Sequence, residues 1–300
     1  MTTKPVRATQ SIVGQMGWVF RRPSLIALEV AWRWIVGVPL LIVCVVQAQN
    51  ILAALPPDTT GLDSLDIANP WISAIKLAAA WDMYRPYVTT VLRWLIPVAA
   101  AAWILASGIG RNLVVMRMQP RVRFRPLAMI VLQTAWVSML ALTIWAWWNA
   151  IGWAAARHIG NGAEPDLVGY TMWAVFLSLG FFTLWAFISW AVAIAPMLVL
   201  LEDRSAVSAF RESLRLGRSF RSKLVEVNLV MGIVKLALVV LAMVFSAVLV
   251  PFSDQVGATA LHVEWLVVSA FYFVASDYFH VVRLKGFVEF WRTFRASQPA

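Results

Sequence analysis

The chain has 300 residues, of which 61% are hydrophobic and only 13% are charged, and its formal net charge is +10. Soluble domains carry roughly 25% charged residues, so this composition excludes an ordinary water-soluble globular fold. The basic residues are dispersed at the ends of apolar runs, which is typical of membrane topology and argues against nucleic acid as a partner.

Residues 1–23 are predicted to form an N-terminal cytoplasmic region with a short interfacial helix. Met1–Gln10 is polar and does not begin a cleavable signal peptide, because no short apolar core with a small-residue cleavage site follows it. The helix is expected over Thr9–Phe20 and ends at the Arg21-Arg22-Pro23 step. The first long apolar segment is therefore expected to remain as an anchor.

Six later segments are each long enough to cross about 30 Å of hydrocarbon as a helix. They are predicted to form one transmembrane domain, residues 24–300, with spans at about 25–52, 89–110, 127–148, 168–200, 224–250 and 265–282. A second surface helix is expected over Trp71–Tyr84. Span 168–200 is over-long, so we expect it to tilt, to break near Gly180, or to project beyond the lipid. The predicted fold class is all-α: a polytopic membrane protein with six transmembrane helices in three hairpins, plus amphipathic interfacial helices.

Most lysine and arginine residues fall in four regions that would share one side of the membrane. These regions are the N-terminus, the turn after the second span, residues 204–223 and the C-terminal tail. The opposite loops hold most of the carboxylates, including Asp58, Asp63, Asp66, Glu164 and Asp166. By the positive-inside rule, both termini are predicted to lie in the cytoplasm, and the expected location is a bacterial inner membrane.

Residues 205–240 join an amphipathic helix to a membrane span. At 100° per residue, one side of this helix is apolar and the neighbouring side is basic. The apolar side holds Val207, Phe210, Leu214 and Gly217. Such a helix lies in the headgroup layer, with its arginines among lipid phosphates. The predicted contacts to the phosphates of anionic lipid are Arg211, Arg215, Arg218 and Arg221.

Ionisable residues at membrane depth are costly, and they are usually functional or paired. The candidates here are Glu29, Arg33, Glu226, Lys235, Asp277 and His280. Glu29 and Arg33 are four residues apart and can form a structural salt bridge on one helix. Glu226 lies just inside the fifth span, where it could contact the arginines of the amphipathic helix.

Lys235 is the most awkward of these groups, because it is near mid-span with no acidic residue one turn away. Asp277 of the last span is its expected partner. Asp277 and His280 share a helix face, and His280 could relay protons near neutral pH. Two interpretations stay open: the three residues line a polar cavity, or they form a static clamp between helices, which we favour.

The sequence shows no catalytic or cofactor motif. It has no HExxH, no Gly-rich phosphate loop, no CxxCH and no GxSxG. Its single cysteine, Cys44, excludes an internal disulfide and a multi-cysteine metal site. We therefore predict no enzyme activity, no cofactor and no metal.

One segment resembles a known group of proteins. Ala206–Val227 carries an A-x-x-x-S-x-x-L-x-x-G turn that enters a span, matched by Ala209, Ser213, Leu216 and Ser219, with Gly217 displaced by two places. It resembles the membrane domain attached to some glycerophosphoryl diester phosphodiesterases and related bacterial inner-membrane families. The resemblance implies a six-helix fold with interfacial helices. It implies no activity, because no phosphodiesterase catalytic domain is present.

The leading functional hypothesis is a non-enzymatic scaffold, accessory or assembly subunit of a membrane complex that contacts anionic lipid. The alternative is a small-solute or lipid transporter that uses Lys235, Asp277 and His280. A buried polar cavity open to one side would favour transport, whereas a continuous apolar groove on the outer surface would favour a subunit.

Overall fold

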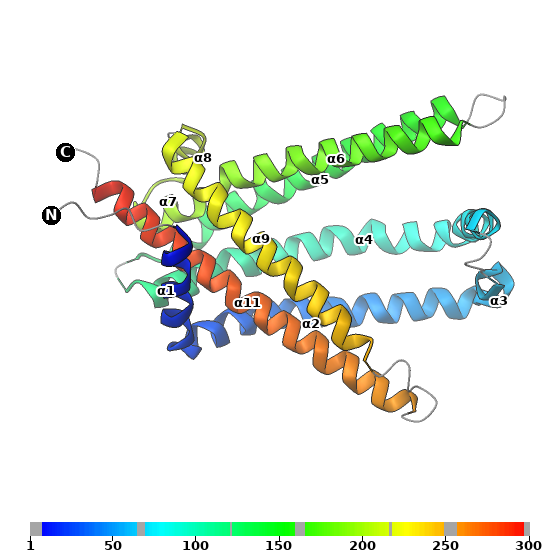
Figure 1. Cartoon of the computed structure of the whole chain (residues 1–300), viewed down its shortest axis with the longest axis horizontal. Helices are drawn as coiled ribbons and strands as arrows, with labels where there is room; N and C mark the ends of the chain where they lie inside the picture. The colour runs from blue at the N-terminus through cyan, green and yellow to red at the C-terminus, as the bar shows by residue number, and fades with distance from the viewer. Residues whose placement is uncertain are drawn as a thin grey trace. The chain divides into compact units, whose positions relative to one another are not determined.

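The computed structural model describes residues 8–64, 70–120, 122–159, 166–215, 218–248 and 257–296 (Figure 1). Every regular element in these ranges is a helix, which confirms the all-α prediction. The long helices are α2 (Pro23–Ala54), α4 (Pro70–Met118), α5 (Pro126–His158), α6 (Leu167–Val192), α9 (Arg218–Ser246) and α11 (Ala258–Ala296). All six are long and apolar enough to cross a membrane, as predicted.

Shorter helices occupy the connections between the long ones. They are α1 (Ala8–Phe20), α3 (Pro57–Thr60), the 3-10 turn η1 (Leu62–Ser64), α7 (Ala195–Leu201) and α8 (Ala206–Arg215). The helix predicted at Thr9–Phe20 is thus present as α1, and its position at the membrane interface stays a prediction.

Proline marks the starts of several helices in this chain. α2, α4 and α5 begin at Pro23, Pro70 and Pro126, and α7 has Pro196 in its first turn. Proline suits these positions because its ring presets the helical φ angle and the first N–H groups of a helix have no partner inside the helix. The start of α8 is fixed differently, because the Ser205 hydroxyl accepts a hydrogen bond from the Ser208 N–H at 3.3 Å.

The chain divides into two compact units, which we describe separately. Unit 1 comprises residues 1–30 and 108–300, and unit 2 comprises residues 31–107. The polar residues predicted at membrane depth fall in unit 1, except Arg33, which lies in unit 2.

Unit 2 is formed by most of α2, the α3 turn and most of α4. The Trp32 and Trp103 rings pack 5.7 Å apart, and the Tyr84 hydroxyl donates a hydrogen bond to the Leu55 carbonyl at 2.7 Å. Figure 1 shows the first part of α4 nearly end-on and the rest lengthwise, so this helix bends. Pro86 lies inside it, and a proline in a helix interior removes a backbone hydrogen bond and causes a kink.

This bend changes the prediction for Trp71–Tyr84. These residues are not a separate surface helix, because they continue into the second span as one helix, Pro70–Met118. Pro86 kinks the helix without ending it.

Unit 1 contains two pairs of neighbouring long helices. In the α5–α6 pair, the Trp147 indole N–H donates to the Ser178 hydroxyl at 3.0 Å, and the Trp136 and Trp185 rings meet edge-on at 5.1 Å. In the α9–α11 pair, the Trp265 indole N–H donates to the Ser246 carbonyl at 2.9 Å. α1 packs on α11 and on α9.

The over-long fourth span is broken, which was one of three expected alternatives, but the break does not lie near Gly180. The helix runs through Gly180 and stops at Val192, and the chain resumes as α7 with Pro196 in its first turn. Glycine permits a break without requiring one, whereas a proline cannot donate the N–H that would continue the helix. The last span also differs, since α11 runs past Val282 to Ala296.

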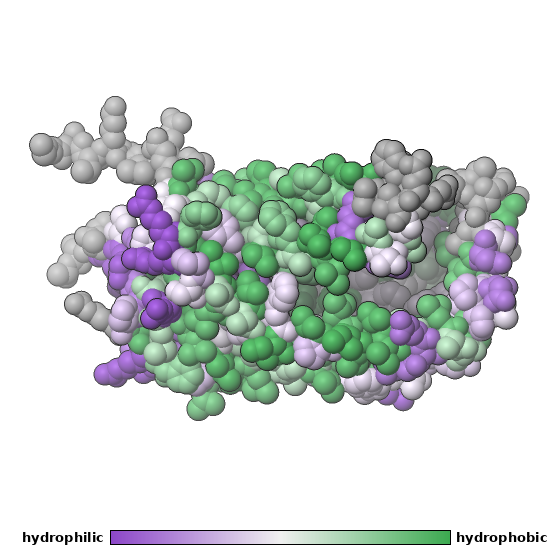
Figure 2. All heavy atoms as spheres, turned by 90° about the horizontal axis from the view of Figure 1, so that it is seen from below, coloured by the Kyte–Doolittle hydropathy of each residue, from purple (hydrophilic) through white to green (hydrophobic). Residues whose placement is uncertain are grey.

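The buried core of unit 1 is formed mainly by α1, α7 and the second half of α11, with the start of α2 and the end of α4. Its most buried apolar side chains include Val19, Leu25, Val114, Val115, Ile194, Leu198, Val199, Val227, Val281, Val282 and Val288. Elsewhere the long helices expose their apolar side chains, such as Phe176, Phe182 and Met243. Figure 2 shows hydrophobic residues over most of the surface in view, as a lipid-facing surface requires.

Candidate functional site

A buried row of ionisable side chains lies where α2 begins against α11. Glu29 has 0% of its side chain exposed and His280 has 5%, and their Oε1 and Nε2 atoms are 3.6 Å apart. On the other side of the imidazole, Arg283 Nη2 lies 3.0 Å from His280 Nδ1. We call these three residues the Glu29–His280–Arg283 row.

The geometry of the row assigns a role to each ring nitrogen of His280. An arginine N–H can only donate, so in this contact His280 Nδ1 accepts from Arg283. His280 Nε2 faces the Glu29 carboxylate. The row thus places an imidazole between a carboxylate and a guanidinium in the interior.

Asp277 and Lys235 belong to neighbouring helices of unit 1. Asp277 is 4% exposed and precedes His280 by one turn on α11, and Lys235 is half-buried on α9. The hydrogen bond from Trp265 to Ser246 sets the register of this pair. From that bond, Lys235 is about 17 Å back along α9 and Asp277 about 18 Å forward along α11, at 1.5 Å per residue. The two residues therefore lie at one level, and their pairing stays a prediction.

α1 packs on α11, which carries two residues of the row, through contacts that the sequence did not predict. The Tyr278 hydroxyl donates a hydrogen bond to the Met16 carbonyl at 3.0 Å. The Trp18 ring lies between two cations, with Arg22 at 3.7 Å and Lys285 at 4.4 Å from its centroid. Such cation–π contacts contribute most where they are desolvated, and Lys285 is only 9% exposed.

A second cluster ties the corner between α7 and α8 to the end of α11. Glu202 Oε1 lies 2.5 Å from Arg295 Nε, and its Oε2 lies 2.8 Å from Arg204 Nε. Burial alone would raise the pKa of Glu202, but the hydrogen bonds from Arg295 and Arg204 outweigh it and hold this pKa below its ordinary value of 4.5. We call this residue and its two arginines the Glu202 clasp.

Asp203 forms a similar contact with the start of α5. Its carboxylate lies 2.5 Å from Arg125 Nε and 3.3 Å from Arg123 Nη1. Its φ angle is +60°, a left-handed conformation that aspartate tolerates better than most residues. The sequence signal for the contacts of Glu202 and Asp203 is the Glu-Asp-Arg run at 202–204. The arginines that these two carboxylates bind in α11 and before α5 are distant in the chain, so the run alone does not identify them.

The remaining predicted residues are dispersed. Arg33 lies in unit 2, with its guanidinium 5.2 Å from the Trp32 ring centroid, and its pairing with Glu29 stays a prediction. Glu226, Arg211 and Arg215 are exposed. The side chains of Arg218 and Arg221, and all of Gly217 and Glu164, fall outside the described residues.

An acidic residue joins the end of α5 to the start of α6. The Asp166 carboxylate accepts the Gly169 N–H at 2.8 Å and lies 3.0 Å from His158 Nδ1. The Gly169 N–H, followed by the His158 contact, lowers the pKa of Asp166 from its ordinary value. Within the described part of the chain, no group of three or more His, Cys, Asp or Glu side chains could hold a metal ion.

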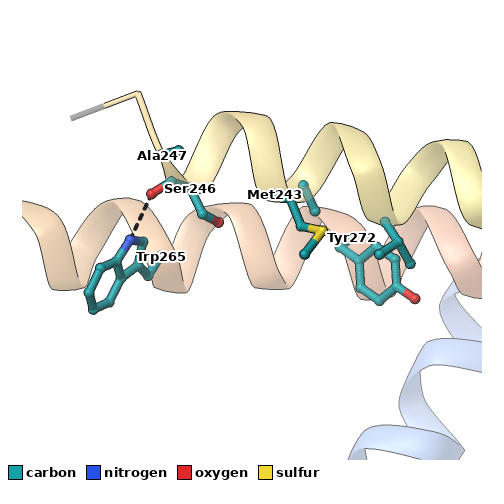
Figure 3. Close-up of a pocket in the computed structure, with 7 residues that line it drawn as sticks. Met243, Ser246, Ala247, Trp265 and Tyr272 are labelled. Atoms are coloured by element: carbon teal, nitrogen blue, oxygen red, sulfur yellow. Dashed lines mark hydrogen bonds between the residues drawn. The ribbon is translucent and has the colours of Figure 1, made fainter. Parts of the chain in front are cut away.

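An apolar groove runs along the α9–α11 pair, and its lining includes no residue of the Glu29–His280–Arg283 row or the Glu202 clasp. It has a volume of about 600 Å³ and is lined by Val239, Ala242, Met243, Ser246, Ala247, Trp265 and Tyr272. Figure 3 shows Met243 between Trp265 and Tyr272 along the groove. A smaller cavity of about 220 Å³ shares Ala242 and Tyr272 with it. Small residues such as Ala242 and Ser246 let another helix approach closely in a membrane.

The chain was compared with known proteins at three levels. No family model matches it. No curated protein and no solved structure matches it either. The resemblance of Ala206–Val227 to a phosphodiesterase-linked membrane domain therefore stays a prediction, and the function is argued from geometry alone.

Proposed function

We propose that the chain is a non-enzymatic integral membrane protein that serves as a scaffold, accessory or assembly subunit of a membrane complex. It crosses a bacterial inner membrane six times, as three hairpins, with both termini in the cytoplasm. The observation that carries the proposal is the apolar groove of the α9–α11 pair, lined by Met243 and Trp265 among others. It is the kind of surface that a transmembrane helix of a partner fits.

The buried ionisable groups support the same proposal. Glu29 and His280 are almost fully enclosed and contact each other across 3.6 Å. Charges that neutralise each other within the fold stabilise one arrangement of helices, whereas a transport pathway needs access to water. The Glu29–His280–Arg283 row therefore acts as a clamp that holds α2 on α11.

The groove can be tested by site-specific photo-crosslinking in native membranes. A photo-reactive residue in place of Met243, which lines the groove, is expected to give an adduct of one defined mass with a partner protein. Ala242→Phe fills the groove and is expected to abolish the adduct. The matched control replaces Leu266, which is 71% exposed and lines neither cavity. Adducts with lipid only, or equal adducts from both positions, would contradict the proposal.

The second candidate is a small-solute or lipid transporter that uses Lys235, Asp277 and His280. One observation favours it: His280 Nε2 lies 3.6 Å from the Glu29 carboxylate, so an imidazole that binds and releases protons near neutral pH faces a second group that can do the same. In liposomes with a pH gradient and an enclosed pH-sensitive dye, a subunit is expected to pass no more protons than protein-free liposomes. Proton flux that His280→Gln abolishes would establish the transporter instead.

A further inference from the structure

α8 presents three different surfaces around its axis. Ala209 and Ser213 are buried against the protein. Val207 is 59% exposed and Leu214 is 44% exposed, so the apolar side points away from the protein. Arg211 and Arg215 are exposed and follow Val207 by roughly 40° and 80° around the helix, at 100° per residue. An apolar edge therefore lies directly beside a basic edge, and both face outward.

The acidic residues near α8 are turned toward the protein. Glu212 lies 3.6 Å from Arg204, and Glu202 is held by Arg204 and Arg295. Asp203 is held by Arg125. The carboxylates around the helix thus already have cationic partners, and the outward side of α8 is left positive.

The corner between α1 and α2 repeats this arrangement. Phe20 is 75% exposed, and the neighbouring Arg21 and Arg22 are exposed as well. α1 packs on α11, whose last turn reaches the α7–α8 corner through the contact between Arg295 and Glu202. The α1–α2 corner and α8 therefore belong to the same end of unit 1.

We infer that α8 and the α1–α2 corner form a docking surface for the phosphate groups of anionic phospholipids. Arg211 and Arg215 bind the phosphates, since a guanidinium donates two parallel hydrogen bonds to such oxygens. Val207, Leu214 and Phe20 enter the boundary of the acyl chains. The inference rests on the membrane location in the proposed function, but not on the groove or on a partner protein.

The test measures lipid bound to the purified full-length protein in a neutral detergent. Phosphatidylglycerol or phosphatidylcholine is titrated at low salt, and the bound lipids are counted by native mass spectrometry. Wild-type protein is expected to prefer phosphatidylglycerol. The R211Q/R215Q variant is expected to bind it roughly 10- to 30-fold more weakly, since each basic residue near the surface contributes about a fivefold gain in affinity.

Matched variants distinguish the loss of charge from a loss of folding. A competition experiment distinguishes a lipid headgroup from free inorganic phosphate as the ligand. R211K/R215K keeps the charge and is expected to keep most of the preference, whereas R85Q/R93Q removes two exposed arginines from unit 2 and is expected to keep it fully. Val207→Ser with Leu214→Ser is expected to weaken binding, and inorganic phosphate is expected not to compete at the lipid concentrations used. The inference is overturned if R211Q/R215Q and R85Q/R93Q behave alike, or if phosphate displaces the lipid. Failure of the crosslinking experiment would leave these results unaffected.

Discussion

Glu29 and His280 are buried together, and each offsets part of the free-energy cost of burying the other. Glu29→Gln keeps the shape of the side chain but removes the carboxylate that faces His280 Nε2. We expect it to lower the free energy of unfolding by about 1–3 kcal/mol, the usual cost of weakening a buried charged contact. Denaturant unfolding of the purified protein in detergent measures this. Glu226→Gln, at an exposed position on α9, is the control and is expected to have no effect.

Gly108 sits where α4 comes close to Ile130 of α5. A Cβ atom there would lie 2.5 Å from Ile130 Cγ1 and 3.2 Å from the Ile130 backbone nitrogen. Because the backbone cannot yield as a side chain can, Gly108→Ala is expected to destabilise the protein by about 1–3 kcal/mol. Gly180→Ala is the control, since its Cβ would meet nothing within 4 Å. Equal melting temperatures for the two variants would contradict the close approach.

For single residues, the sequence predicted which ionisable side chains are buried better than it predicted which side chains they contact. Asp277 and His280 were predicted to share a face of one helix, and both are buried on α11. That Glu29 would face His280 could not be foreseen, because the contact joins the first span to the last and depends on how α1 packs on α11. The partners of Glu202, which come from two other segments, were missed for the same reason.

The α7–α8 corner is the element whose stability should depend on pH. Hydrogen bonds from Arg295 and Arg204 hold the pKa of Glu202 below 4.5 in the folded protein. The unfolded chain binds a proton more readily, so the contribution of Glu202 is present above about pH 4.5 and is lost as the pH falls through the lowered value. The stability difference between wild type and Glu202→Gln is therefore expected to be largest at neutral pH and to shrink below pH 4.5. A constant difference across this range would refute the role of the clasp.

The spans were predictable as elements because a long apolar run has few other structures available in lipid. Their ends were less predictable. The surface helix predicted over Trp71–Tyr84 continues into the second span, because the single internal proline at Pro86 removes one hydrogen bond while the remaining ladder continues through Pro70–Met118. For the fourth span, a break near Gly180 was one of three alternatives, beside tilting and projection beyond the lipid; the break instead comes just before α7, which has Pro196 in its first turn.

For the molecule as a whole, the proposed topology puts α3 and the end of α11 on opposite sides of the membrane. The prediction is tested in a Cys44→Ser background with a membrane-impermeant maleimide. Thr59→Cys, exposed in α3, is expected to react in cells with a permeabilised outer membrane. Thr293→Cys, exposed near the end of α11, is expected to react only after lysis. The reverse pattern would overturn the assignment of the termini.

Composition and charge predicted how many helices could cross a membrane, but not where their core would form. Lipid is as apolar as the side chains it touches, so a hydrophobic pattern does not say which faces of the helices meet. The concentration of buried residues in α1, α7 and the second half of α11 depends instead on small residues, ion pairs and close approaches. These become visible only in three dimensions.

The contact between Tyr278 and Met16 joins residues that are 262 positions apart. At about 5–20 residues per second, a ribosome needs roughly 13 to 52 seconds to make the intervening chain. During that interval Glu29 has left the ribosome while His280 and Arg283 do not yet exist. The contacts of Glu29 with α11 therefore form only after the last helix has been made, so the first and last long helices are joined at the end of synthesis.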